Sequence, residues 1–180
     1  MKSIQYKRAS NLAELEQIIA LQKSNFSVSI SPEEKIEEGF VTVQHSLELL
    51  EKMNFACAHI IAKQEGKVVG YALVMLSNFR QEIEVLVPMF ERIDLLVPPE
   101  KNYVVMGQIC VAKAFRKQGI FRGLYDFYRT EFQNKFDYLI TEVDANNTRS
   151  IEAHEAIGFK TKESYLEDGK LWNIIIWDWK

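Results

Sequence analysis

The sequence lacks the features that mark several large classes of protein. Its two cysteines, Cys57 and Cys110, lie far apart in apolar runs, which favours reduced thiols over a disulfide framework or a metal site. No uninterrupted apolar run is long enough to span a membrane, and residues 1–7 lack the apolar segment of a secretory signal. The 22 basic residues do not outnumber the 25 acidic ones, so the formal net charge of −3 gives no overall field to attract nucleic acid. We therefore expect a soluble, cytoplasmic protein that binds neither a membrane nor nucleic acid.

The common nucleotide-binding loops are also absent. No G-x-x-x-x-G-K-[ST] occurs, and no G-x-G-x-x-G follows a predicted strand, so no motif supports a nucleoside triphosphate or dinucleotide site. What is present is a basic turn within residues 111–124, between a predicted strand and a predicted amphipathic helix. Gly119 would let the backbone approach an anion, which Arg116, Lys117 and Arg122 would neutralise. Because a helix N-terminus also offers unpaired N–H groups and a partial positive charge, this turn predicts a pyrophosphate site.

The order of predicted elements indicates the fold class. The chain of 180 residues, 47% of them hydrophobic, fits one domain over residues 1–180 better than two. Asn11 and Glu14 have the spacing of a capping box, and Glu65-Gly66 predicts a tight hairpin. We expect strands at 4–8, 55–64, 67–76, 103–112, 138–143, 159–165 and 171–179, helices from 11, from 31 to about 53, at 119–134 and at 147–157, and a long connection at 77–102. This mixture indicates an α/β or α+β fold with helices packed on a central sheet.

Two segments resemble the signatures of one known family. Arg116-Lys-Gln-Gly119-Ile-Phe121 resembles the [RQ]-x-x-G-x-[GA] acyl-coenzyme A loop of the GNAT superfamily of N-acetyltransferases. Residues 147–159, which begin at Asn147 and end in Gly158-Phe159, resemble that family's second signature, an N-x-x-[AS] helix start followed by Gly-Phe. With the predicted strand between them and the predicted hairpin upstream, the two segments extend the resemblance over roughly the C-terminal half of the chain.

The resemblance implies a mixed, mostly antiparallel central sheet whose fourth and fifth strands splay apart, with helices on both faces. It implies acetyl-coenzyme A as cosubstrate and no metal. The residues expected to bind coenzyme A are Ile109, Cys110 and Val111 along the pantetheine arm, Arg116 as a counter-charge, the amides of Gln118, Gly119, Phe121, Arg122 and Gly123 at the pyrophosphate, and Asn147 near the arm. For Asn147 a helix cap without ligand contact is an equally good interpretation, since Asn is a favoured N-cap residue. Phe121 replaces the small residue usual in the loop, so its side chain is expected to turn into the core.

The implied reaction is direct attack of an amine on the acetyl thioester. An alkylammonium loses its proton only near pH ~10 in water, so a base or an ordered water must accept that proton. Glu142 is the candidate base, the Val111 amide the candidate oxyanion donor, and His154 the candidate acid for the departing thiolate. His154 stands where many members of the family carry a tyrosine, which leaves its role open between an acid and a packed side chain. For Glu142 the alternative is a solvated or ion-paired strand carboxylate.

The acceptor is open at this stage. Segments 31–54 and 77–102, which would flank the acceptor opening in this family, contain carboxylates that favour a cationic amine. We expect a small-molecule amine, with a peptide or protein amine as the alternative. A rival interpretation of the chain is a non-catalytic or regulatory module that binds acyl-coenzyme A, because the tyrosine acid is missing. Monomer and homodimer are both open, as are acetyl and longer acyl groups.

Overall fold

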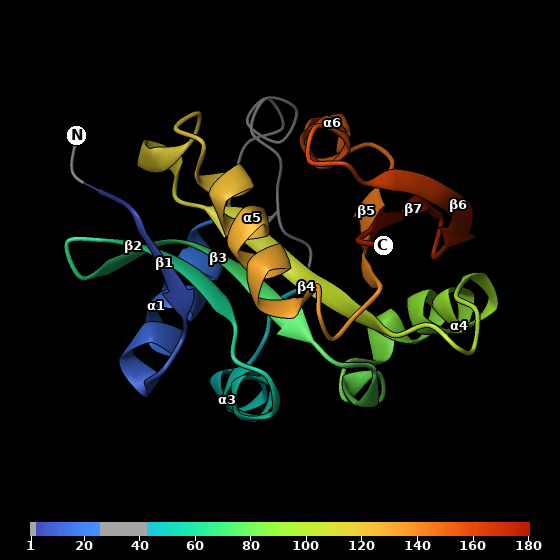
Figure 1. Cartoon of the computed structure of the whole chain (residues 1–180), viewed down its shortest axis with the longest axis horizontal. Helices are drawn as coiled ribbons and strands as arrows, with labels where there is room; N and C mark the ends of the chain where they lie inside the picture. Colours follow the sequence, from blue (N-terminus) through green and yellow to red (C-terminus); the bar gives the residue numbers. More distant parts are fainter. Residues whose placement is uncertain (1–2, 26–42) are drawn as a thin grey trace.

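A mixed sheet of seven strands runs through the computed structural model, which describes residues 3–25 and 43–180 (Figure 1). Its strands lie in the order β1 (Gln5–Arg8), β2 (Ile60–Gln64), β3 (Lys67–Met75), β4 (Tyr103–Val111), β5 (Tyr138–Asp144), β7 (Lys170–Asp178) and β6 (Lys160–Glu167). Neighbouring strands are antiparallel except β4 and β5, which are parallel. The mixed, mostly antiparallel sheet implied by the resemblance is confirmed.

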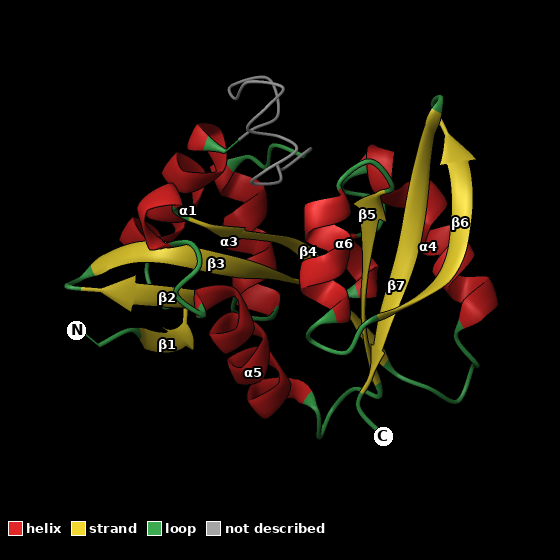
Figure 2. Ribbon diagram, turned by 90° about the horizontal axis from the view of Figure 1, so that it is seen from above, coloured by secondary structure: helices red, strands yellow, loops and turns green. Residues whose placement is uncertain are grey.

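The two halves of the sheet separate between β4 and β5. Pairing runs over residues 103–105 of β4 and 138–140 of β5, and beyond it β4 continues to Val111 and β5 to Asp144. In the view from above, β2, β3 and β4 run in a clearly different direction from β5, β6 and β7 (Figure 2). One extra residue in β4 lies where the gap begins, because Ala72 of β3 pairs with Ile109 while Val74 pairs with Met106. A bulge of this kind bends its strand, and the predicted splay of the fourth and fifth strands is confirmed.

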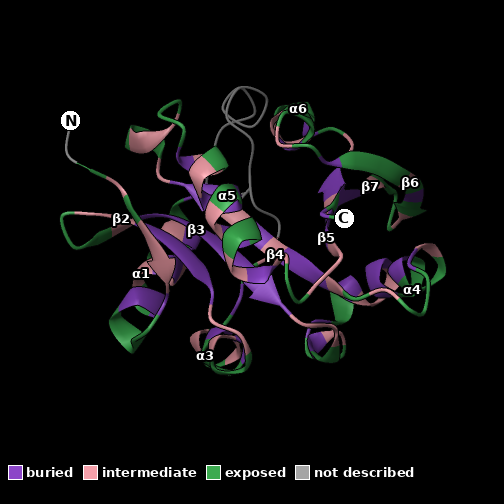
Figure 3. Cartoon of the chain, in the orientation of Figure 1, coloured by how far each residue is buried: buried purple, intermediate pink, exposed green. Residues whose placement is uncertain are grey.

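Helices cover both faces of this sheet, as expected. On one face lie α1 (Leu12–Ser24), α3 (Leu47–Ala56) and α4 (Val87–Leu96), and on the other lie α5 (Ile120–Phe132) and α6 (Thr148–Glu155) (Figure 1). The central strands β3, β4 and β5 and the inner sides of the helices are largely buried, whereas the edge strand β6 and the outer sides of the helices are largely exposed (Figure 3). On α5 the buried side chains include Tyr125, Tyr128 and Phe132, so aromatic packing holds this helix on the sheet. Among the helices described, none is long and apolar enough to cross a bilayer.

The segment before β2 corrects two predictions. The expected helix at 31–53 lies mostly outside the described residues; within them, residues 43–46 are not helical and α3 begins at Leu47. It begins there because the side chain of Ser46 caps the helix by accepting a hydrogen bond from the Leu49 N–H. The expected strand at 55–64 was wrong over residues 55–59, because α3 continues to Ala56 and β2 starts only at Ile60.

The hairpin between β2 and β3 is confirmed. Gln64 pairs with Lys67, which leaves Glu65 and Gly66 as a two-residue turn. Their φ angles are 50° and 81°, so both residues are left-handed, as a type I′ turn requires.

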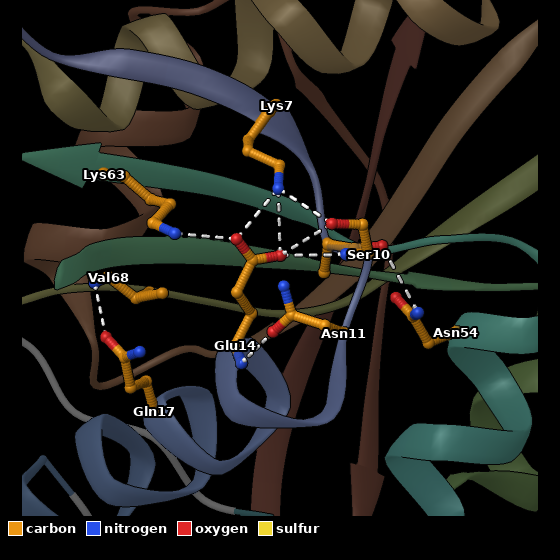
Figure 4. Close-up of polar contacts among 9 residues, drawn as sticks. Lys7, Ser10, Asn11, Glu14, Gln17, Asn54, Lys63 and Val68 are labelled. Carbon is orange, nitrogen blue, oxygen red and sulfur yellow. Dashed lines mark hydrogen bonds and ion pairs between the residues drawn. The ribbon is translucent and has the colours of Figure 1, made fainter. Parts of the chain in front are cut away.

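A buried carboxylate ties α1 to the sheet. Asn11 caps the helix as predicted, because its side chain accepts a hydrogen bond from the Glu14 N–H at 3.0 Å. The Glu14 carboxylate is 2% exposed and accepts hydrogen bonds from Lys7 (2.8 Å), Lys63 (2.7 Å) and the Ser10 N–H (2.8 Å) (Figure 4). Burial alone would raise the pKa of Glu14, but these hydrogen bonds lower it to about 2. The carboxylate is therefore charged at neutral pH and holds α1 against β1 and β2.

Candidate functional site

The turn predicted to bind an anion lies between β4 and α5. A short 3₁₀ turn, η4 (Lys113–Phe115), follows β4, and the chain is then left-handed at Lys117 (φ 60°) and Gly119 (φ 80°). Gly119 is the N-cap of α5, and the first bond of the helix runs from the Gly123 N–H to the Gly119 carbonyl at 3.0 Å. The N–H groups of residues 120–122 precede that bond and have no partner within the helix, which is the arrangement that binds anions.

A cavity of about 410 Å³ opens beside this turn, between the end of β4 and the helices α5 and α6. The expected coenzyme A residues that line it are Ile109, Cys110, Val111, Arg116, Gly119, Phe121, Arg122 and Asn147. Lys117 and Arg149 add two cations to Arg116 and Arg122, and Glu152 is the one carboxylate among the described lining residues. This excess of positive charge suits a ligand with several phosphate groups. Arg149 was missed from the sequence, although it lies two residues after the Asn147 helix start.

Two arginines of the turn are fixed by carbonyl groups and an amide. Arg116 donates from Nε to the Val111 carbonyl at 3.1 Å and from Nη2 to the side chain of Asn25, at the end of α1. Arg122 donates from Nη2 to the Ala156 carbonyl at 2.8 Å. Both guanidinium groups therefore hold their charge at the cavity in one orientation.

One expected pyrophosphate contact needs correction. The Gly123 N–H is already bonded to Gly119, and a Cβ built on Gly123 would lie 2.1 Å from Tyr6 Oη, so this glycine serves close packing of α5 against β1. The Gln118 side chain is exposed and donates to the Ala114 carbonyl at 3.0 Å, and the expected contact of its backbone N–H stays a prediction. The Gly123 contact was expected from the family resemblance, whereas the helical geometry leaves the N–H groups of the three residues that follow Gly119 without partners in the helix. Phe121 is half-buried and packs edge-on against Tyr125, so its side chain only partly turns into the core.

The end of β4 presents backbone groups to the gap. The Ala112 N–H donates to the Val69 carbonyl of β3 at 2.9 Å, and successive N–H groups of a strand point in opposite directions. The Val111 N–H therefore points away from β3, toward the gap between β4 and β5. Beside it, burial raises the pKa of the Cys110 thiol to about 12, so that side chain is an apolar wall and not a nucleophile.

A second cavity, of about 80 Å³, lies in the gap itself. Its described lining includes Glu142 and Asp144 of β5, His154 of α6, and Trp172 of β7, and it contains neither lysine nor arginine. Ile109, Asn147 and Ser150 line both cavities, so the two cavities adjoin at these side chains. In the described part of the chain, no cluster of three or more His, Cys, Asp or Glu could hold a metal ion.

Glu142 has the properties of a base that works near neutral pH. Tyr165 donates a hydrogen bond from its hydroxyl to Glu142 Oε2. Burial raises the pKa of Glu142 to about 7; the Tyr165 hydrogen bond opposes this rise and the charge of Glu167 adds to it. A carboxyl group with such a pKa exchanges a proton readily near neutral pH. The hydrogen-bond partner of Glu142 among the described residues is thus the neutral Tyr165 hydroxyl, and its role as a base stays a prediction.

His154 is held by both of its ring nitrogens. Nδ1 lies 2.6 Å from the Ser150 carbonyl oxygen and therefore carries the ring proton. Nε2 lies 2.6 Å from the Tyr125 hydroxyl and accepts a hydrogen bond from it. The residue is 1% exposed, and burial lowers its pKa to about 4, so the imidazole is neutral at neutral pH. Its single N–H is bonded to a carbonyl, and this geometry does not favour the expected role as an acid.

Two amide side chains shape the junction of the cavities. Asn147 is the N-cap of α6, since its Oδ1 accepts from the Ser150 N–H at 3.2 Å, and it also lines both cavities. The side chain therefore caps the helix, and contact with a ligand stays a prediction. Gln108 is fixed by accepting from Gln22 (2.8 Å) and donating to the Val43 carbonyl (2.7 Å), contacts that no local pattern indicated.

Comparison with known proteins agrees with this geometry. The family model described as the Acetyltransferase (GNAT) family matches residues 15–159, and no curated protein matches the sequence. Among solved structures, the NatC complex bound to Gag peptide and CoA has a TM-score of 0.70 at 14% identity, covering 99% of both chains. The ribosomal-protein-S18-alanine N-acetyltransferase from Escherichia coli has a TM-score of 0.66 at 13% identity, covering 98% of this chain and 94% of that one. The structure of yncA from Salmonella typhimurium with its cofactor acetyl-CoA has a TM-score of 0.65 at 14% identity, with the same coverage of 98% and 94%. The structures share the fold, and the family model covers most of the sequence: the chain belongs to the GNAT family of acetyltransferases.

Proposed function

We propose that this protein is an N-acetyltransferase that moves the acetyl group of acetyl-coenzyme A onto a small, cationic primary amine in a ternary complex. The observation that carries the proposal is that two cavities of opposite charge adjoin at the gap between β4 and β5, where three side chains line both. The larger cavity is ringed by four basic side chains, and the smaller one contains two carboxylates. A donor held by its phosphates on one side and an amine held on the other would meet at that junction.

For the donor, the proposed contacts are the N–H groups of residues 120–122 and the cations of the turn at its pyrophosphate. Arg149 supplies further charge from α6. The end of β4, with Ile109, Cys110 and Val111, would flank the pantetheine arm, and Asn147 would lie beside it. Acetyl-coenzyme A supplies the activated thioester, and the residues of this chain supply orientation and proton transfer.

For the chemistry, Glu142 takes one proton from the ammonium group of the acceptor, directly or through a water. The neutral nitrogen then attacks the thioester carbonyl, and the Val111 N–H donates to the oxyanion that forms, a contribution of about 3 kcal/mol for a donor of this kind. The carbon–sulfur bond breaks, and the second proton on the nitrogen passes to the departing thiolate. The products are the acetamide and free coenzyme A, and this sequence needs no separate acid.

His154 has a different role in this proposal. Its N–H donates a hydrogen bond to the Ser150 carbonyl, and its unprotonated nitrogen accepts one from the Tyr125 hydroxyl, so we propose that it is a positioning residue. It joins α6 to α5 next to the gap and so keeps the walls of the two cavities at a fixed separation.

The acceptor class follows from charge. Glu142 and Asp144 lie in a cavity whose described lining carries no lysine or arginine, so an ammonium group is attracted and a carboxylate next to the amine is repelled. We therefore expect monoamines and diamines to be better acceptors than α-amino acids. Peptide amines are the second class to test.

The test is a screen for thiol release, with acetyl-coenzyme A and a panel of alkylamines, diamines, amino acids and peptides. Calorimetry with coenzyme A accompanies it. The proposal predicts tight binding and thiol release with at least one amine, and loss of release without loss of binding in Glu142→Gln. Binding without release from any amine would instead favour a non-catalytic acyl-coenzyme A binding module, and absence of binding would refute both.

A further inference from the structure

The base assigned above is held by a hydroxyl group whose role the reaction scheme leaves open. Tyr165 of β6 donates to Glu142 Oε2. We infer that Tyr165 is a positioning residue for acetyl transfer, which orients the Glu142 carboxylate at the gap and sets the pH above which that carboxylate accepts a proton. The inference rests on the proposed function, because the role exists only if Glu142 is the base.

The order of strands brings the two side chains together. β7 lies between β5 and β6, and across it Glu142 pairs with Ile174, Asp144 pairs with Trp172, and Trp172 pairs with Tyr165. Directly paired residues, and residues two apart on one strand, lie on the same face of a sheet. Glu142 and Tyr165 therefore share a face, and the tyrosine reaches diagonally over β7 to the carboxylate.

The ring of Tyr165 is itself held from α4. The guanidinium carbon of Arg92 lies 5.5 Å from the ring centroid, and Arg92 Nη1 donates to Glu163 Oε1 at 3.0 Å. Tyr165 is 7% exposed, so the ring is packed between this cation and the sheet. A donor fixed in this way holds the carboxylate in one orientation before the acceptor arrives.

The charges around the pair act in opposite directions. Burial raises the pKa of Glu142; the Tyr165 hydrogen bond lowers it, and Glu167, also on β6, raises it. Burial and then the Glu142 hydrogen bond raise the pKa of Tyr165 above its usual range, so the phenol remains a donor wherever Glu142 titrates. From α4, Arg92 supplies a positive charge at the tyrosine ring.

Two other titratable side chains face the same cavity as Glu142. Asp144 of β5 and His154 of α6 line the same cavity. Burial lowers the pKa of His154 to about 4, so it is neutral throughout the range in which Glu142 titrates. Removal of the Tyr165 hydroxyl and removal of the Glu167 charge should therefore shift the titration of Glu142 in opposite directions.

The experiment compares Tyr165→Phe with Glu167→Gln in the full chain. In the wild type, kcat/KM should rise with pH through an acidic limb near pH 7. Tyr165→Phe should move that limb up by about one pH unit or more, because a hydrogen bond to a charged group is lost. Glu167→Gln should move it to lower pH. At a pH above the limb, both variants should come within about tenfold of the wild-type kcat, which a general disruption of the site would not allow.

A second measurement does not depend on turnover. Carbon-13 NMR of labelled glutamate carboxyl groups, with Glu142→Gln to assign the signal, follows the titration of Glu142 in the protein without ligands. The midpoint should rise in Tyr165→Phe and fall in Glu167→Gln. If the wild type transfers no acetyl group while the midpoint moves as stated, the proposed function fails and the Tyr165 contact stands as a structural one. If the wild type is active and neither the midpoint nor the limb moves in Tyr165→Phe, the inference is overturned.

A milder variant guards against misfolding. Arg92 is on the surface, with 45% of its side chain exposed, and Arg92→Met should release the ring without opening the core. It should shift the limb and the NMR midpoint in the same direction as Tyr165→Phe, by a smaller amount. Loss of activity by the same factor at every pH, in both variants, would overturn the inference in favour of a purely structural tyrosine.

Discussion

Replacing Glu142 by glutamine should stabilise the folded protein, and only at neutral and alkaline pH. The pKa of Glu142 in the folded state is about 7, above the ordinary value of 4.5, because the carboxyl group is buried. The folded protein thus binds this proton more tightly than the unfolded chain does, and its stability falls as the pH rises from about 4.5 to about 7. Glutamine cannot ionise and still offers Tyr165 an oxygen, so the variant avoids that loss.

The size of the effect follows from the two pKa values. At about 1.4 kcal/mol per pKa unit, the interval between them corresponds to at most about 3 kcal/mol. Solvent that reaches the carboxylate through the cavity reduces this, so we expect about 1–3 kcal/mol at pH 8 and about zero at pH 4.5 or below. The same variant should lose about 10²–10⁴-fold in kcat, the usual contribution of a general base. Greater stability with lower activity is what a buried functional charge predicts.

Urea unfolding at pH 4.5 and pH 8, followed by tryptophan fluorescence, measures the difference in the free energy of unfolding between variant and wild type. Glu152→Gln, on an exposed residue of α6, is the matched control and should stay within about 0.5 kcal/mol of the wild type at both values. A difference for Glu142→Gln that is equal at the two pH values would refute the reasoning. Destabilisation at pH 8 would do the same, since it would mean that the charged form is favoured by folding.

Three further predictions concern other parts of the chain. Gly119→Asp should weaken coenzyme A binding by about 30-fold or more in calorimetry, because it brings a negative charge that repels the pyrophosphate at the helix N-terminus. The control is Gly169→Asp, at a left-handed glycine (φ 72°) in the β6–β7 turn, which should leave binding unchanged. Glu14→Gln should destabilise the protein by about 2–3 kcal/mol at pH 7, measured by urea unfolding. Because the pKa of Glu14 in the folded protein is about 2, the difference from the wild type should disappear as the pH falls from 4.5 through 2. The control is Glu16→Gln, on the exposed side of the same helix. His154→Gln should keep kcat within about tenfold of the wild type and lower the midpoint of urea unfolding, and a loss of more than about 10³-fold in kcat with an intact fold would instead support an acid role.

The sequence predicted the local geometry of the turn after β4 and of the start of α6 well. The turn after β4 and the start of α6 depend on residues a few positions apart: Gly119 permits a left-handed N-cap, and Asn147 caps its own helix. The contact carried over from the family resemblance to Gly123 was wrong, because the first helical bond already uses the N–H of that residue. The strand predicted over residues 55–59 was wrong for a related reason, because the helix cap at Ser46 and packing on α3 outweigh the strand preference of an isolated apolar run.

The acceptor side could only be described in outline from the sequence. Glu142 and His154 were candidates by position, but their protonation states depend on burial and on partners from other elements. Tyr165 had no signal of its own, because it acts from β6 across β7 on a residue of β5.

By itself, the sequence determined the left-handed turn at Gly119, the helix caps at Asn11 and Asn147 and the β2–β3 hairpin, since each depends on backbone conformation and hydrogen bonds within a few residues. The tertiary structure alone decided that the two cavities adjoin at the gap between β4 and β5. It also decided that Glu142 accepts a hydrogen bond from Tyr165 and that both ring nitrogens of His154 are hydrogen-bonded, one to Ser150 and one to Tyr125. The physical reason is that a proton affinity is set by desolvation and by neighbouring dipoles and charges, and strand order, not spacing along the chain, determines which groups become neighbours.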